Sequence, residues 1–275
     1  MHAECPADLA RLIDAVRRVA HTEIMPRYLQ VTHDHKGDGS WLTAADVAAQ
    51  LALSRELAEI ADAPLLGEEM SSAEQQDAWD RGTHGVWCVD PIDGTTNFVF
   101  GLPFFAVSVA FMREGRSEYG VVYDPVADEM FYAARDAGAW LNGKRLPIRL
   151  PPPELADATA NIDLKRLPRA LGLALASRPP YGSQRNLGAS SLEWCYTAAG
   201  RFSVYVHGGQ KLWDYAAGAL ILEEAGGRCA TLEQDDFWTC RLWERSAIAA
   251  TTPELFEPWA NWIESVVGPV SDRLA

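Results

Sequence analysis

The hydrophobic and polar positions of the chain follow two different periods, which predicts a mixture of helices and strands. Near the N-terminus and in the second half, apolar residues recur every three to four positions, the spacing of one helix face. Between residues 86 and 148 the runs are short and β-rich and are separated by turn residues such as Asn142-Gly143, as in an antiparallel meander. We therefore predict helices at 6–29, 43–61, 164–175, 190–200, 212–227 and 252–266, and strands at 86–90, 105–113, 119–124, 129–135, 139–148 and 202–207.

A proline run at 150–154 is the best candidate for a boundary, because consecutive prolines continue neither a helix nor a sheet. It predicts an N-terminal α+β half at 1–150 and a C-terminal α/β half at 151–275. The order of helices, sheet, helix, sheet and helices requires layers of both kinds to stack on each other. The polar, glycine-bearing segment 31–41 is predicted to be an exposed, mobile loop.

Composition and charge exclude several classes of partner. The 275 residues are 48% hydrophobic and carry a net charge of −14, from 38 acidic and 24 basic residues. Nucleic-acid backbone and anionic membranes would repel such a chain. A small anionic molecule can still bind if a metal ion supplies positive charge locally.

Neither a signal peptide nor a membrane span is predicted, so we expect a cytoplasmic protein. The N-terminal segment mixes charges into a helical pattern, and the longest apolar stretch, 100–111, is shorter than the ~20 residues of a spanning helix. Five cysteines without a CxxC pair fit reduced thiols better than disulfides or a zinc site. The tryptophans are expected to pack in the interior.

The stretch DPIDGTTNF at 90–98 is the first candidate for chemistry. Alone it is typical of a surface turn. If a strand ends at Asp90, however, Asp93 and the carbonyl of Ile92 lie beside it, giving three oxygen ligands in four residues. Gly94 permits an unusual backbone angle, and Thr95 begins a helical turn whose free N–H groups can hold a phosphate oxygen. A hard cation and a phosphate would then meet at one place.

Further carboxylates come from distant segments. The run 66–69 has the pattern of a strand that delivers Glu68 at its tip, and Asp214 lies in the first turn of an apolar helix. Taken singly, Glu68-Glu69 is more typical of a solvated acidic pair and Asp214 of a helix cap. The segment His33-Asp34-His35 lacks a third spaced ligand and is more typical of a solvated loop than of a metal site.

Together, GEE at 67–69, WCVDPIDGTTNF at 87–98 and WDYAAGALILEEAGG at 213–227 resemble the inositol monophosphatase family of the Mg²⁺-dependent, lithium-sensitive sugar-phosphatase superfamily. The resemblance covers nearly the whole chain. It implies an α/β (α+β) fold, the layered αβαβα sandwich of the inositol monophosphatase and fructose-1,6-bisphosphatase type. It also implies a phosphoric monoester hydrolase, commonly a homodimer, that uses about two or three Mg²⁺ ions.

The resemblance also implies a role for each matching residue. Direct in-line attack by water on a small phosphorylated metabolite is expected, without a Cys, Ser or His nucleophile. The Thr95 hydroxyl, hydrogen-bonded to Asp46, would relay the proton. The metal ligands implied are Glu68, Asp90, the Ile92 carbonyl, Asp93 and Asp214.

The remaining matches concern water and substrate. Glu69, Thr95 and Asp46 would position and activate the attacking water. The Gly94 and Thr95 amides would hold the phosphate, and Lys36 would belong to a loop that closes over the site.

The leaving group is expected near Ala189, within 188–191, and near His207, where inositol-type members usually carry an acid that holds ring hydroxyls. An imidazole can bond a hydroxyl, suits a second anion if protonated, or can simply end the strand. Members that cleave 3′-phosphoadenosine 5′-phosphate tend to carry a lysine and an acid where this chain has Thr96 and Asn97, although 191–195 looks somewhat like their helix.

We therefore rank a small polyol monophosphate first as substrate. A sugar bisphosphate or phosphoadenosine phosphate is the alternative. A catalytically silent metal-binding or interaction protein ranks last, because Glu68, Asp90, Asp93, Thr95 and Asp214 are all present.

Overall fold

The computed structural model describes residues 6–30, 33–35, 41–233, 236–239 and 242–268. Its larger sheet is a meander with strands in chain order, and only its first pair is parallel. This confirms the predicted antiparallel meander, and positive φ angles at Asn142 and Gly143 confirm its last turn. The strands are β3 (Leu65–Gly67), β4 (Val86–Asp93), β5 (Ala106–Arg113), β6 (Arg116–Asp124), β7 (Glu129–Ala134), β8 (Gly138–Leu141) and β9 (Lys144–Arg145).

The second sheet is built from residues after the proline run. Its strand order is β11-β10-β12-β14-β13, in which β10 is parallel to both of its neighbours and the remaining pairs are antiparallel. These strands are β10 (Thr159–Asp163), β11 (Ser183–Arg185), β12 (Val204–Lys211), β13 (Arg228–Ala230) and β14 (Glu244–Ala250).

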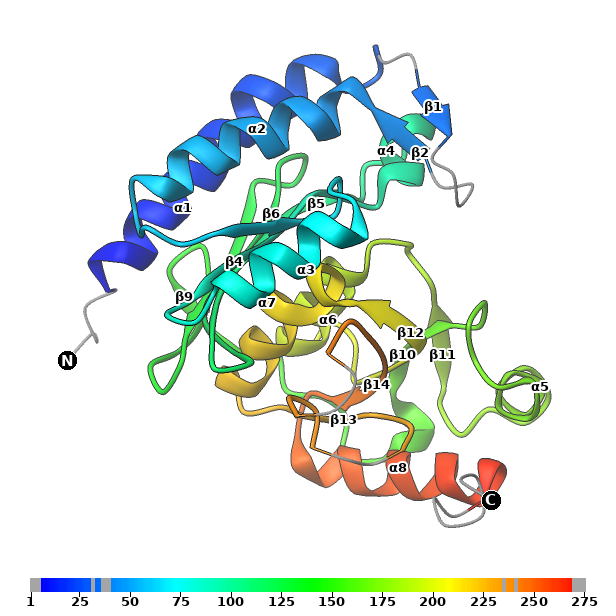
Figure 1. Ribbon diagram of the computed structural model, residues 1–275. Helices are drawn as coiled ribbons and strands as arrows, with labels where there is room; N and C mark the ends of the chain where they lie inside the picture. The colour runs from blue at the N-terminus through cyan, green and yellow to red at the C-terminus, as the bar shows by residue number, and fades with distance from the viewer. Residues whose placement is uncertain (1–5, 31–32, 36–40, 234–235, 240–241, 269–275) are drawn as a thin grey trace.

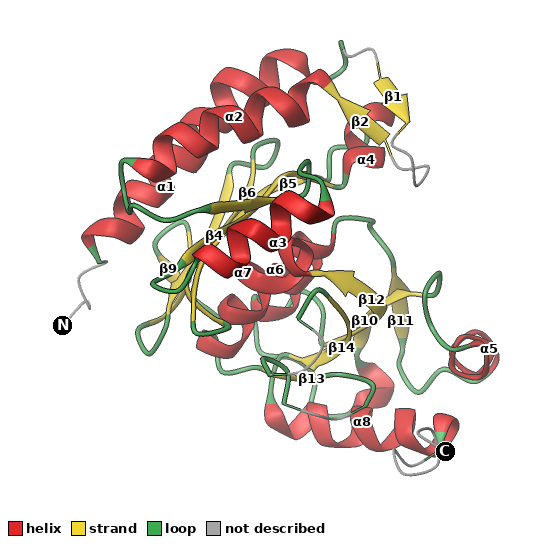
Figure 2. Cartoon of the chain, viewed as in Figure 1, coloured by secondary structure: helices red, strands yellow, loops and turns green. Residues whose placement is uncertain are grey.

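Helices cover both sheets and fill the space between them (Figure 1). Helices α1 (Ala7–Val19) and α2 (Ala44–Ala58) pack on the outer face of the larger sheet, and α5 (Arg169–Ser177) and α8 (Pro253–Val267) on that of the smaller one. Helices α6 (Ser190–Ala198) and α7 (Leu212–Glu224) share one core with both sheets. Figure 2 shows the resulting alternation of helical and sheet layers, which confirms the predicted αβαβα sandwich.

The central helices approach each other closely. A Cβ at Gly218 of α7 would lie 2.4 Å from the Cβ of Trp194 on α6, so only glycine permits this crossing. Of the predicted reduced cysteines, Cys88, Cys195 and Cys229 have free thiols, whereas Cys5 and Cys240 lie outside the described residues. No helix in the described ranges is both long and apolar enough to cross a membrane.

Several predicted boundaries were wrong. The helix predicted at 164–175 begins only at Arg169, because Pro168 disfavours a helical conformation in the residue before it. The predicted loop at 31–41 contains β1 (His33–His35), which pairs with β2 (Trp41–Thr43). The N-terminal helix continues from α1 as a π-helical turn at Ala20–Ile24 and a 3₁₀ turn at Met25–Arg27. Sequence reasoning missed α3 (Ser72–Arg81), β11, β13 and β14.

Candidate active site

A β-bulge brings the two aspartates of the DPID segment to the same side of the sheet. The strand predicted to end at Asp90 continues to Asp93, because the bulge accommodates Pro91 within β4. Asp90 pairs with Ser108 and Asp93 with Ala106, so β4 has one more residue than β5 across this interval. In a regular strand, the side chains of residues three positions apart point to opposite faces of the sheet. The extra residue of the bulge shifts this alternation by one position, so Asp90 and Asp93 point to the same face.

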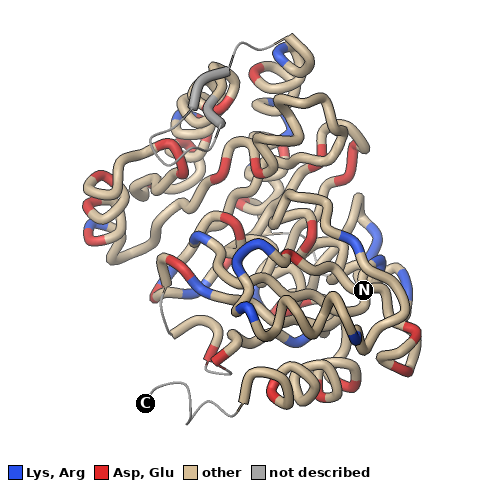
Figure 3. The backbone as a smooth tube through the Cα atoms, turned by 90° about the vertical axis from the view of Figure 1, so that its right-hand side faces the viewer, with Lys and Arg blue, Asp and Glu red and all other residues tan. Residues whose placement is uncertain are grey.

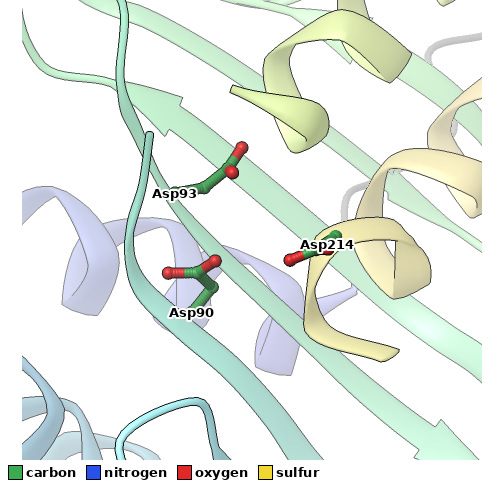
Figure 4. Close-up of side chains that lie close together, drawn as sticks. All are labelled: Asp90, Asp93 and Asp214. Carbon is green, nitrogen blue, oxygen red and sulfur yellow. The ribbon is translucent and has the colours of Figure 1, made fainter. Parts of the chain in front are cut away.

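A third aspartate, Asp214, reaches the same place from α7, and we call the site formed by Asp90, Asp93 and Asp214 the carboxylate corner. The Asp214 Oδ2 atom accepts a hydrogen bond from the Lys211 backbone N–H at 2.9 Å, so Asp214 also caps its helix. Each of Asp90, Asp93 and Asp214 offers a carboxylate oxygen, and these oxygens lie within 4.8 Å of one another. Figure 4 shows the three carboxyl groups turned toward one shared space.

The start of α6 fixes the orientation of Asp93. The backbone N–H of Ser190 donates to one carboxylate oxygen of Asp93 at 3.2 Å, and the backbone N–H and hydroxyl of Ser191 donate to the other at 2.6 Å each. These three bonds join the meander to the central helical layer. Sequence reasoning did not assign this role to either serine, since nothing in the sequence marks which carboxylate they contact.

Burial and mutual repulsion disfavour the charged form of this cluster. Burial raises the pKa of Asp93 to about 6 and that of Asp214 to about 8, and raises the pKa of Asp90 well above its usual range. The charge of Glu68 adds to the effect at all three positions. A bound cation would reverse it by stabilising the carboxylates.

These shifts predict how the stability of the metal-free protein depends on pH. The pKa of Asp214 is about 8 in the folded protein against 3.8 for an ordinary aspartate, so the folded state holds its proton more tightly. Its contribution to stability is complete below about pH 4 and is lost as the pH rises through about 8. In EDTA, wild type should lose stability relative to Asp214→Asn over this window.

Thermal melts of both proteins at several pH values measure this difference. Saturating Mg²⁺ should raise the melting temperature of wild type at pH 8 and have a much smaller effect on Asp214→Asn. A constant difference between the two proteins across the window would contradict the raised pKa of Asp214.

The donor set of the corner fits a hard divalent cation. It consists of oxygen atoms only, from buried and half-buried carboxylates that repel one another and from a nearby main-chain carbonyl. Mg²⁺ prefers oxygen ligands, whereas zinc sites of proteins are built mainly with Cys or His. No Cys or His belongs to this cluster of the described residues.

Gly94 and Thr95 begin a short helix directly after the aspartates. Gly94 has a φ of +87° and precedes α4 (Thr95–Phe100). A Cβ at Gly94 would lie 3.0 Å from the Cβ of Ala189, so a side chain there would be both strained and crowded. The Thr95 hydroxyl donates to the Ile92 carbonyl at 3.0 Å, which ties the first residue of α4 back to β4.

Glu193 supports the segment that closes this side of the site. It is buried, and one of its carboxylate oxygens accepts hydrogen bonds from the backbone N–H groups of Leu187 (3.0 Å) and Gly188 (2.9 Å). Asn97 in turn donates to the Leu187 carbonyl at 2.7 Å. Burial raises the pKa of Glu193 to about 7, although these backbone bonds oppose the shift.

Removing this support should weaken the fold. Glu193→Ala removes the acceptor of two partly buried N–H groups and should cost about 1–3 kcal/mol in free energy of unfolding. Glu193→Gln keeps an acceptor oxygen and is the matched control. Urea unfolding of the two variants measures the cost, and an alanine variant as stable as the glutamine variant would refute it.

Glu68 lies beside the aspartates, at the end of β3. Its backbone N–H donates to the Val89 carbonyl of β4 at 3.1 Å, and its charge raises the pKa of Asp90, Asp93 and Asp214. The backbone N–H of the next residue, Glu69, donates to the Gln50 side chain at 3.1 Å.

Asp46 caps α2. Its Oδ2 atom accepts a hydrogen bond from the Thr43 backbone N–H at 2.8 Å, which forms a capping box with the Thr43 side chain. Asp46 Oδ2 also accepts a hydrogen bond from the Thr43 hydroxyl at 2.5 Å, and the relay between Asp46 and Thr95 stays a prediction. Lys36 lies outside the described residues.

His207 is held by the protein itself. It is 3% exposed, its Nε2 lies 3.1 Å from Asp163 Oδ2, and its Nδ1 accepts the Gly209 N–H at 3.1 Å. A contact between this ring and a substrate, as predicted from the sequence, would have to break one of these bonds. Ala189, also predicted to contact substrate, is buried next to Gly94.

A layered αβαβα sandwich with an oxygen-only carboxylate site at its centre is the architecture of a magnesium-dependent phosphatase. The chain belongs to the inositol monophosphatase family, whose sequence model matches residues 8–266.

Individual relatives agree with this assignment. An inositol-1-monophosphatase of Caulobacter vibrioides is 34% identical over 245 residues, covering 82% of this chain and 90% of the relative. A protein of Pasteurella multocida named Nus factor SuhB is 36% identical over 197 residues, covering 70% and 72%. The solved structure of a Thermotoga maritima IMPase superposes with a TM-score of 0.79 at 27% identity, covering 95% of this chain and 98% of the other.

Proposed function

We propose that this protein hydrolyses small phosphate monoesters with the help of Mg²⁺. The observation that carries the proposal is the convergence of Asp90, Asp93 and Asp214, two buried acids from β4 and a half-buried one from α7, whose carboxylate oxygens lie within 4.8 Å of one another. Membership of the inositol monophosphatase family and relatives named inositol-1-monophosphatase support a phosphomonoesterase.

The acids at the corner would hold the cation, and the residues after them would hold the phosphate. Asp90, Asp93, Asp214, Glu68 and the Ile92 carbonyl would be the ligands. When bound, Mg²⁺ supplies positive charge that lowers the pKa of an attacking water and offsets the charge of the phosphate. The backbone N–H groups of Gly94 and Thr95 would face the phosphate oxygens.

Proton movement would centre on the Thr95 hydroxyl. This group donates to the Ile92 carbonyl, so its lone pairs can accept a hydrogen bond from the attacking water. Glu69 would orient the water. For the relay, the Thr95 hydroxyl would turn from the Ile92 carbonyl to Asp46, pass its own proton to that carboxylate and take one from the attacking water. No protein nucleophile is required.

Phosphate release from a substrate panel tests the proposal. The panel contains inositol-1-phosphate, fructose-1,6-bisphosphate, phosphoadenosine phosphate and histidinol phosphate, each assayed with Mg²⁺ and then with EDTA. At least one ester should be cleaved with Mg²⁺, and EDTA should remove that activity. Turnover that survives EDTA, or none on any ester, would count against the proposal.

An interaction role is a second candidate, favoured by relatives that carry the name Nus factor SuhB. It is compatible with catalysis, since this chain keeps every implied ligand. We also propose, from the family alone, a cytoplasmic homodimer that lithium inhibits. Sedimentation and a lithium titration of the phosphatase activity test the last two properties.

A further inference from the structure

A cavity of about 640 Å³ opens directly beside the carboxylate corner. Glu68 and Asp214 are among its lining residues, so a phosphoester held at the corner would extend its leaving group into this space. Trp213 and Trp243 also line the cavity. Their flat faces suit a ring-shaped leaving group, either a sugar or a base.

Two basic side chains, Arg166 and Lys211, line the same cavity. The whole chain has a net charge of −14, and acidic and basic residues are interspersed over the face in Figure 3. The two positive side chains beside the carboxylate corner therefore form a local basic site on an acidic protein. They would repel the predicted metal ion, but they would attract an anionic group on a substrate.

The backbone around Arg166 is built to hold it there. Arg166 donates from one guanidinium nitrogen to the Gly209 carbonyl at 2.9 Å. A Cβ at Gly208 would lie 1.8 Å from the Arg166 carbonyl oxygen, so glycine is required for β12 to approach this turn. Asp163 ties down the same turn, because it accepts the Lys165 N–H at 2.7 Å and contacts His207.

Lys211 is able to contribute to the same subsite. Its Nζ pairs with Glu244 Oε2 at 2.5 Å, but both side chains are exposed, at 48% and 59%. Exposed ion pairs contribute little to stability, so an incoming anion can compete for the ammonium group. A neutral polyol could accept hydrogen bonds from these two side chains but would lack the charge attraction that an anion gains.

We propose that Arg166 and Lys211 form an anion subsite that selects phosphate monoesters whose ring-shaped leaving group carries a second anionic group. The inference rests on the proposed phosphatase function and specifies its substrate class. It reverses the ranking from sequence, because bisphosphorylated substrates now precede a neutral polyol monophosphate. His207 then acts as a positioning residue that holds Asp163, and through it the turn bearing Arg166.

Specificity measured on matched variants tests the subsite. Values of kcat/KM are compared for phosphoadenosine phosphate, fructose-1,6-bisphosphate and inositol-1-phosphate, in wild type and in the double variant Arg166→Gln/Lys211→Gln. Wild type should prefer at least one bisphosphate, and the preference should fall by roughly ten- to a hundredfold in the double variant, the scale of hydrogen bonds to charged groups. Which bisphosphate is preferred separates a nucleotide from a sugar.

Lys165→Gln is the matched control, since it removes a neighbouring exposed charge that does not line the cavity. Its substrate preference should equal that of wild type. An unchanged preference in the double variant, or a wild-type preference for inositol-1-phosphate, would overturn the subsite while leaving the phosphatase function intact.

A binding measurement separates the two proposals completely. Calorimetric titration of phosphoadenosine phosphate into metal-free protein needs no turnover, and the double variant should bind at least about tenfold more weakly than wild type. If wild type cleaves no ester but shows this difference, the phosphatase function fails and the subsite stands. Equal binding by both proteins would overturn the subsite.

Discussion

Replacing Asp93 with asparagine should lower kcat by about a thousandfold or more while leaving the fold intact. Asp93 is held by three hydrogen bonds from Ser190 and Ser191 and faces Asp90 and Asp214. Asparagine has the same shape and keeps one acceptor oxygen for the serine donors, but it lacks the charge that would hold a divalent cation. Loss of that cation removes the stabilisation on which hydrolysis depends.

Steady-state kinetics of phosphate release measure the loss of kcat, and circular dichroism shows whether the fold is intact. Ser191→Ala is the control, because it removes one donor to Asp93 but keeps the carboxylate. Its loss should be smaller, about ten- to a hundredfold. If Asp93→Asn kept full activity at subsaturating Mg²⁺, Asp93 would not be a ligand.

Removing the Thr95 hydroxyl should lower kcat by about 10²–10⁴-fold and change KM much less. The hydroxyl is expected to act on the attacking water, whereas substrate is expected to be held by the backbone and the cation. Because the lost interaction belongs to the reaction rather than to binding, the defect should appear in kcat. Thr95→Ala tests this by initial rates at saturating Mg²⁺.

Thr95→Ser keeps a hydroxyl at the same position and is the matched control. It should retain most of the wild-type kcat. A large rise in KM at unchanged kcat in Thr95→Ala would instead place Thr95 among the groups that merely bind substrate.

The layers of the fold were predictable because helical segments and strands differ in their sequence patterns. The meander at 86–148 is a series of short β-rich runs separated by turn residues, and its Asn142-Gly143 turn follows from the left-handed conformations that these residues tolerate. The missed helix α3 begins with a capping box of Ser71 and Glu74, a signal that the sequence does carry. Strand β11 is three residues long and half-buried, too short to show a period.

The acidic corner was predictable in composition but not in geometry. The DPID segment suggested that Asp90 and Asp93 lie together, yet the device that aligns them is a bulge within β4, which depends on pairing with β5. Arg166 and Lys211 could not be assigned from sequence. Their placement depends on how closely β12 passes the turn after β10, a contact between residues more than forty positions apart.

The central claim is that acids distant in sequence converge to hold divalent cations. Crystals soaked in Mn²⁺, an anomalous scatterer that accepts the same oxygen ligands, test it directly. The anomalous map should show at least one peak with carboxylate oxygens of Asp90, Asp93 and Asp214 at about 2.0–2.3 Å. A map without a peak at this corner, or with a peak that Asp214 does not contact, would contradict the account.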